Sequence, residues 1–283
     1  MPTRRNRTQG VLTHDVGDTI DVHERSGFQG ARLSATVMLL RDGADGLEVW
    51  MQERVLSMPN YPGITVFPGG GVDSRDFPPR AWDDGELWLG RSAISLARQL
   101  GVTKYKAHAL VFAAARELFE ESGILFAIRD YGKISDVRGY YRERRLLENH
   151  TISFTEFLSN NGMRVDTDML FPWARWVGQS KNHWFDTFFF VAVLPRGQEP
   201  DGDTHEADDA GWFSPQLVLE GWRAGLVRLV VPTWAQMQRL CKYSTVQEVL
   251  DDASSSDLRP VIGDPRNDPQ YAEYFATTPT ERI

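Results

Sequence analysis

The stretch AAARELFEESGIL, residues 113–125, decides how this sequence is interpreted, because it places three carboxylates within one helical turn. At 100° per residue, Glu117, Glu120 and Glu121 fall within about 100° of arc on one face of a helix. The bulky apolar residues and one alanine fall on a different arc and are expected to pack inward: Val111, Phe112, Ala115, Leu118 and Phe119. The stretch therefore predicts an amphipathic helix that presents a cluster of acidic side chains.

Two interpretations of this cluster are open from its spacing. Like charges three and four residues apart destabilise a helix by roughly 0.2–0.5 kcal/mol per pair, and only Arg116 lies near enough to compensate. A solvated acidic face is the first interpretation. The second is a site for a hard divalent cation such as Mg²⁺ or Mn²⁺, which prefers oxygen ligands. Ala113 and Ala114, one turn back, are then expected to leave open space in front of the carboxylates.

Composition limits the class of protein. The 283 residues are 41% hydrophobic, which is enough for one large folded domain. No apolar run reaches the roughly 18 residues of a membrane span, and MPTRRNRTQG lacks the apolar segment of a secretory signal. Cys241 is the only cysteine, which excludes an intrachain disulfide and a thiolate-rich zinc site. We expect a soluble, cytoplasmic protein with no membrane partner, and the net charge of −8 argues against nucleic acid.

Hydrophobic periodicity predicts a mixture of strands and helices. The predicted strands are 31–40, 47–55, 64–67, 172–178, 184–195 and 211–213. The predicted helices are 91–101, 104–122, two within 138–162, one at 214–225 and one at 232–253. This mixture predicts an α/β or α+β domain with helical insertions. We assign residues 1–30 to a lead-in, 31–250 to a single domain and 251–283 to a C-terminal tail that is extended from Ser254 onward.

FPGGGVD (67–73) together with RELFEESGI (116–124) resembles the signature of the Nudix hydrolases, G-x5-E-x7-R-E-U-x-E-E-x-G-U, where U is a bulky apolar residue. Residues 116–124 match its second half without a gap. The first half begins at Gly70 and places Asp76 where the family has glutamate. Between Asp76 and Arg116 lie 39 residues where the pattern has seven, so the signature looks split by an insertion at about 77–108. The apolar residues of 77–103 predict that this insertion is packed and partly helical.

The interrupted signature resembles the branch of the family that includes acyl-coenzyme A diphosphatases, and the similarity extends over about residues 31–225. The resemblance implies an α/β/α sandwich around a mixed sheet. It also implies hydrolysis of a phosphoanhydride bond in a small nucleoside diphosphate derivative. Coenzyme A or its acyl esters are the first candidate substrates, and ADP-ribose or another nucleotide derivative is the second. A non-catalytic binding or regulatory protein is the alternative, although such a protein would typically have lost a glutamate of the signature. A homodimer is also considered.

The resemblance assigns roles to particular residues. Glu117, Glu120 and Glu121 would be the ligands of Mg²⁺ or Mn²⁺, with one of them serving instead as a base. A backbone carbonyl of Gly69 or Gly70 would complete the coordination, because glycine lets the main chain approach closely. Arg116 would orient one glutamate through its fork of donors, the alternative being a solvated helix arginine. Asp76, with its shorter side chain, is expected to be structural.

Further candidates lie later in the chain. Many members of the family take an additional acidic group from a loop after the signature, and DGDTHEADDAGWF (201–213) offers Glu206 as the first candidate. A solvated acidic loop is the alternative, and His205 is expected to be a surface histidine. The aromatic residues of 184–190 are expected to be strand core and not a base-stacking platform. These are Trp184, Phe185, Phe188, Phe189 and Phe190.

Overall fold

A mixed β-sheet forms the centre of the molecule. The computed structural model describes residues 22–55, 62–79, 86–130, 132–180, 182–204, 207–256 and 258–277. Among these residues the sheet runs in the order β11–β2–β1–β10–β9–β12, with β3 also paired to β2 and β4 to β1. Its strands are β1 (Arg32–Gly43), β2 (Gly46–Arg54), β3 (Thr65–Val66), β4 (Gly69–Gly71), β9 (Phe171–Ser180), β10 (His183–Val193), β11 (Ala207–Phe213) and β12 (Val261–Ile262). The pairs β1–β10 and β9–β12 are parallel and the other pairs are antiparallel.

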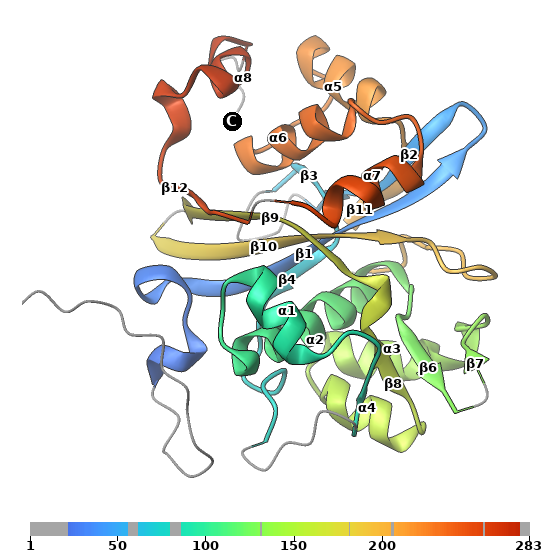
Figure 1. Cartoon of the computed structure of the whole chain (residues 1–283). Coiled ribbons are helices and arrows are strands. Elements are labelled where there is room, and N and C mark those ends of the chain that lie inside the picture. The colour runs from blue at the N-terminus through green and yellow to red at the C-terminus, as the bar shows by residue number, and fades with distance from the viewer. Residues whose placement is uncertain are drawn as a thin grey trace, which may run out of the picture.

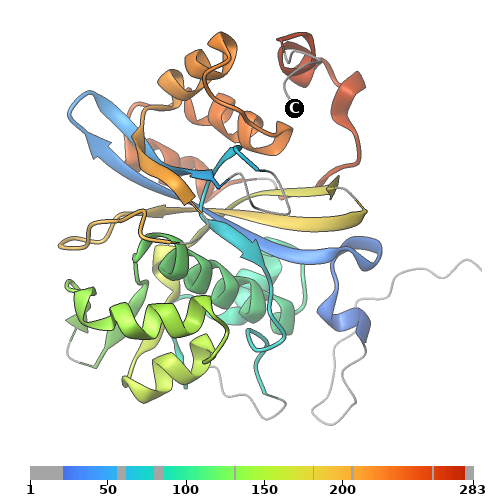
Figure 2. The ribbon, with the colours of Figure 1, turned by 180° about the vertical axis from the view of Figure 1, so that it is seen from behind.

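Helices cover both faces of this sheet (Figures 1 and 2). One layer contains α1 (Ala93–Leu100), α2 (Lys104–Ser122), α3 (Tyr141–Glu148) and α4 (Phe154–Asn160). The other contains α5 (Pro215–Ala224), α6 (Val231–Leu240), α7 (Val246–Ala253) and α8 (Ala272–Thr277). A smaller sheet in the first layer has the order β5 (Trp88–Leu89), β8 (Arg164–Asp166), β6 (Ala127–Arg129) and β7 (Gly132–Lys133). The predicted α/β/α sandwich around a mixed sheet is confirmed.

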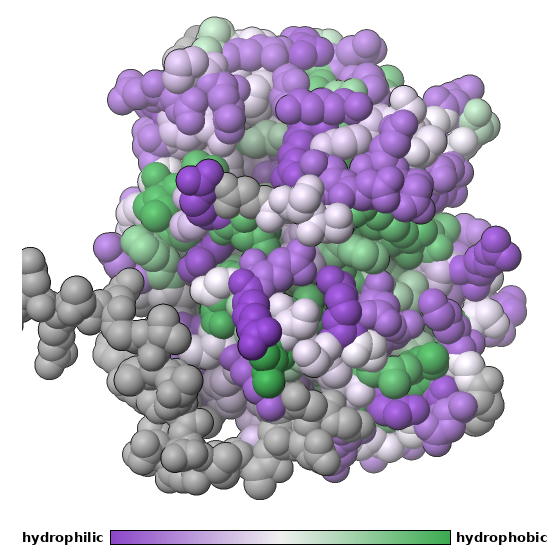
Figure 3. Space-filling model, viewed as in Figure 1, coloured by the Kyte–Doolittle hydropathy of each residue, from purple (hydrophilic) through white to green (hydrophobic). Residues whose placement is uncertain are grey.

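Alternation along β1 builds two cores and leaves room for a cleft. Leu33, Ala35 and Val37 point into the core shared with α2, whereas Met38 and Leu40 pack under the opposite helical layer. In the first half of the strand, however, the positions that face this second layer are polar: Arg32, Ser34 and Thr36. Because these side chains are polar, this part of the sheet face forms the floor of a cleft and is not packed as core. On the face shown in Figure 3, polar side chains dominate the second layer, and apolar areas lie at the level of the sheet.

Helix α2 has the predicted limits because local signals set both ends. The Thr103 side chain accepts a hydrogen bond from the backbone N–H of Lys106, and Gly123 closes the helix in the left-handed conformation. The expectation of open space beside Ala113 and Ala114 is wrong, since both side chains are fully buried in the core. These small residues instead allow α2 to pack closely against its neighbours.

Residues 77–108, which we predicted to be an insertion, are packed and partly helical where the structure describes them. They contain β5, α1 and the first turns of α2, and the side chains of Trp88, Leu96 and Leu100 are buried. Residues 80–85 lie outside the described residues. The two ends of the excursion meet, because Asp76 and Arg116 form an ion pair.

Two expectations about the C-terminal region are wrong. The single helix expected at 232–253 is two helices, α6 and α7, because Thr245 and Glu248 form a capping box that begins a new helix. The expected extended tail instead folds back: β12 pairs with β9, and Tyr271 is buried against Trp176. Among the described residues, the helices lack the combination of length and apolar composition that crossing a bilayer requires.

Candidate active site

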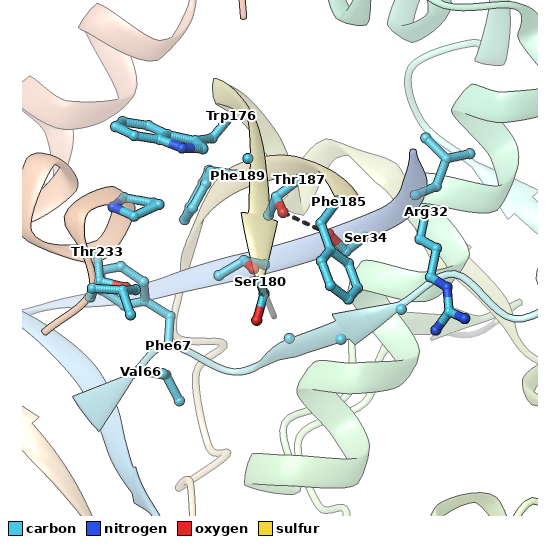
Figure 4. A pocket seen from close by; sticks show the side chains of 18 of the residues that line it. Arg32, Ser34, Val66, Phe67, Trp176, Ser180, Phe185, Thr187, Phe189 and Thr233 are labelled. Carbon is cyan, nitrogen blue, oxygen red and sulfur yellow. Dashed lines mark hydrogen bonds between the residues drawn. The ribbon is translucent and has the colours of Figure 1, made fainter. Parts of the chain in front are cut away.

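A cleft of about 1390 Å³ lies over the first half of β1 and the neighbouring parts of β4, β9 and β10. Figure 4 shows its floor, with the hydroxyls of Ser34 and Thr187 hydrogen-bonded in the middle, Arg32 and Phe185 at one end, and Trp176 at the other. The C-terminal segment contributes to its wall through residues 263–266 and 274–275. The glutamates of α2 reach this cleft from beneath β4.

Two of the three glutamates, Glu117 and Glu121, lie against the backbone of the glycine run. Glu121 accepts hydrogen bonds on one carboxylate oxygen from the N–H of Gly69 (2.9 Å) and from Nε2 of Gln52 (2.7 Å). A Cβ on Gly70 would lie 2.5 Å from a carboxylate oxygen of Glu117, so only glycine permits this approach. Glu120 and Glu121 are only 7% and 4% exposed. The interpretation of the cluster as a solvated acidic face is therefore wrong.

Arg116 links the two halves of the signature. Its Nε and Nη2 donate to the two carboxylate oxygens of Asp76, each at 3.0 Å, and Nη2 also donates to the carbonyl of Gly71. Its Nη1 donates to Glu120 (3.0 Å) and lies 2.9 Å from a carboxylate oxygen of Glu117. Arg116 is buried, so the alternative of a solvated helix arginine is wrong. Asp76 is buried as well and holds Arg116 by both oxygens, which is the structural role expected of it.

Burial makes this arrangement electrostatically demanding. Burial raises the pKa of Glu120 to about 8; the charge of Arg116 opposes this shift, and the carboxylate of Glu117 adds to it. Burial by itself would lower the pKa of Arg116, but Glu117, Asp76 and Glu120 raise it well above its ordinary value. One oxygen of Glu120, Oε1, is buried and has no hydrogen-bond partner among the described residues. One arginine thus serves several buried carboxylates, which leaves the site short of positive charge.

The donor set fits a hard divalent cation. Within the described ranges, no three acidic, histidine or cysteine side chains already converge as a metal site. Arg116, Gln52 and the N–H of Gly69 hold the carboxylates instead. The oxygen-only donors, the unpartnered Oε1 of Glu120 and the shortage of positive charge all suit Mg²⁺ or Mn²⁺.

Some expected residues are not placed in the site. Glu206 and His205 lie outside the described residues. The loop just before them is held on α3, where Arg144 contacts Asp201 and Arg145 contacts Asp203, each at 2.7 Å. Phe188, Phe189 and Phe190 are buried in the cores as expected. The core interpretation is wrong for Trp184, which is 45% exposed and lines the cleft with Phe185.

Gln52 was missed by sequence reasoning. It is buried on β2 and orients Glu121. The signal was a lone amide in LEVWMQERV, at a strand position that an apolar residue could equally have filled. A buried amide needs a hydrogen-bond partner, so its presence in a strand could have pointed to a polar site nearby.

Comparisons with known proteins agree with this geometry. No family model matches the chain. The crystal structure of a NUDIX hydrolase from Alicyclobacillus acidocaldarius superposes with a TM-score of 0.65 at 26% identity, covering 81% of this chain and 98% of that one. The acyl-coenzyme A diphosphatase NUDT19 of Xenopus laevis is 23% identical over 234 residues, which is 71% of this chain and 62% of the relative. The chain therefore spans less than two thirds of the length of that relative.

Proposed function

Because this chain belongs to the Nudix hydrolase family, we propose that it is a divalent-metal-dependent hydrolase of a phosphoanhydride bond in a nucleoside-diphosphate-linked small molecule. One observation carries this proposal. Three glutamates from one turn of α2, two of them buried and Glu117 half-buried, line a large cleft beside the glycine run of β4. Burying such a cluster costs free energy unless a cation or a substrate-bound metal compensates its negative charge.

The proposed roles follow from the contacts of each side chain. Glu117, Glu120 and Glu121 would hold Mg²⁺ or Mn²⁺, with a carbonyl of Gly69 or Gly70 completing the ligand set. When bound, the cation would neutralise phosphate oxygens and lower the pKa of a bound water. Arg116 restrains Glu117 and Glu120, the latter by the hydrogen bond from its Nη1.

The remaining groups position or supplement these ligands. Gln52 and the N–H of Gly69 fix the orientation of Glu121 by sharing one of its oxygens. One of the three glutamates serves as the base, and Glu206 is a further proposed acidic group. Thr204, two residues before Glu206, lines the cleft together with the three glutamates, which supports that role.

Coenzyme A or an acyl-coenzyme A is the leading substrate, and ADP-ribose or another nucleotide derivative is second. The relative from Xenopus laevis, which bears the name of an acyl-coenzyme A diphosphatase, supports the first choice. The cleft supports a long substrate, because its volume of about 1390 Å³ exceeds the roughly 300–1,000 Å³ of an ordinary small-molecule pocket.

A substrate panel tests the proposal. Coenzyme A, its acyl esters, ADP-ribose, dinucleotides and nucleoside triphosphates are each assayed with Mg²⁺ and with Mn²⁺, and the products are identified by mass spectrometry. Cleavage at a phosphoanhydride bond by the wild type, and its loss in the folded Glu121→Gln variant, would support the hydrolase. Saturable binding of these compounds without cleavage would favour the non-catalytic alternative. That outcome is disfavoured by the presence and position of all three glutamates.

A further inference from the structure

We propose that one end of the cleft, formed by Arg32, Trp184 and Phe185 and called here the Arg32 end, is the subsite for the nucleotide half of the substrate. The ring of Phe185 would stack on the base, and Arg32 would bind an anionic group of the same nucleotide. The inference rests on the proposed function and deepens it, because it states which half of a two-part substrate binds where.

Arg32 is the first observation. Five of the described arginines line the cleft. The other four interact with other residues. Arg25 contacts Tyr105 and Phe77, Arg116 pairs with Asp76, and Arg266 contacts Asp264 and Phe275. Arg54 also has an interaction within the chain. Within the described parts of the chain the side chain of Arg32 has no hydrogen bond, ion pair or ring contact, and it is exposed. A guanidinium in this state presents all its donors to an incoming anion, and its planar fork suits a phosphate.

The ring of Phe185 is the second observation. Phe185 is directly opposite Arg32 in the parallel pairing of β1 with β10, and Trp184 is the next residue. Because neighbouring residues of a strand point to opposite faces, the Phe185 ring lies on the same face as Arg32 and Ser34. It contacts no other aromatic ring in the described part of the chain, and it lines the cleft. At the opposite end the rings are already engaged: Trp176 with Tyr271, and Tyr274 with Trp222, Trp234 and Phe275. Free aromatic faces beside a free cation are what a nucleotide base and its phosphate require.

The position along the sheet is the third observation. Ala35 pairs with Gly70, where Glu117 contacts the glycine run. Arg32 lies three residues earlier on β1, which places it about 10 Å along the strand at roughly 3.3 Å per residue. A diphosphate that starts at the glutamates can therefore extend toward the Arg32 guanidinium, which would bind the phosphate next to the ribose. Arg32 and Trp184 also line an adjoining hollow of about 330 Å³ beyond the cleft, which offers space for a base.

Isothermal titration calorimetry tests this assignment without any turnover. The probes are AMP and ribose 5-phosphate, which share a phosphate and a ribose and differ by the base, in buffer containing Mg²⁺. We expect Arg32→Ala to weaken both probes by about tenfold, as the loss of a charge-assisted hydrogen bond does. Phe185→Leu should weaken AMP alone, by about tenfold, toward the affinity of ribose 5-phosphate. Arg138→Ala removes an exposed arginine that does not line the cleft and should change neither affinity.

Three results would overturn the inference: no saturable binding of AMP to the wild type, unchanged AMP affinity in Arg32→Ala, or as large a loss in Arg138→Ala as in Arg32→Ala. Circular dichroism of each variant confirms that it is folded. The outcome is separable from that of the substrate panel. AMP binding that depends on Arg32 supports the subsite even where no compound is cleaved, and cleavage with an unaffected Arg32→Ala titration refutes the subsite while the hydrolase stands.

Discussion

Replacing Arg116 by methionine should destabilise the fold more strongly than replacing any exposed arginine, because Arg116 is the counter-charge of a buried carboxylate cluster. Its guanidinium is only 6% exposed, and it pairs with Asp76 and Glu120, whose side chains are 2% and 8% exposed. Methionine retains much of the apolar volume but leaves both carboxylates without their cation. The variant therefore isolates the loss of charge from the loss of packing.

The magnitude follows from the burial of these partners. Removing one member of a buried ion pair typically costs about 3–5 kcal/mol of unfolding free energy. Burial already raises the pKa of Glu120 to about 8, so Glu120 can take up a proton when Arg116 is gone. Protonation limits the contribution of Glu120 to the loss of unfolding free energy. Asp76 carries most of the cost, since Arg116 occupies both of its oxygens. For a chain of this size the expected fall in the thermal midpoint is on the order of 10 °C.

Urea and thermal unfolding, followed by circular dichroism, measure this loss. Arg138→Met is the matched control, because Arg138 binds Asp136 with the same two-pronged geometry at 2.9 Å but is 89% exposed. We expect little change in the unfolding free energy of Arg138→Met. Adding Asp76→Asn to Arg116→Met should recover part of the loss, because the buried group is then neutral. A midpoint for Arg116→Met equal to that of Arg138→Met would refute the reasoning.

Three further predictions concern catalysis and pH. Excess EDTA should abolish hydrolysis and added Mg²⁺ or Mn²⁺ should restore it; undiminished turnover in EDTA contradicts a metal mechanism. Glu121→Gln should fold normally, because an amide oxygen can still accept from Gln52 and Gly69. Its kcat should fall by more than about a hundredfold, and a near-wild-type kcat would remove Glu121 from the site. Burial lowers the pKa of His108 to about 4, so between pH 6.5 and 4 the unfolded chain binds a proton that the folded chain does not. The unfolding free energy should therefore decrease as pH falls through this window. Urea unfolding at several pH values should show a shallower decrease in His108→Phe, and equal slopes would contradict the assignment.

The sequence by itself determined the features that depend on local signals. Thr103 and Gly123 delimit α2 because a capping residue acts only within about one turn of the helix end at which it stands. The position of the carboxylate cluster on α2 follows in the same way from 3.6-residue periodicity. The main strands were predictable because their apolar and β-branched residues favour a pleated, half-buried backbone. Local reasoning failed at 241–245, where a helical pattern and a new capping box compete over a few residues.

Only the tertiary structure decided what those local elements meet. Asp76 and Arg116 are 40 residues apart, and Gln52 and Glu121 are 69 apart, so spacing in the sequence says nothing of their contact. The Arg32 end exists because β1 pairs with β10 and aligns Arg32 with Phe185 across more than a hundred residues. The return of β12 beside β9 likewise completes the cleft wall. Such pairings form only when burial in the whole sheet offsets the entropy of closing long loops, and no local propensity encodes that balance.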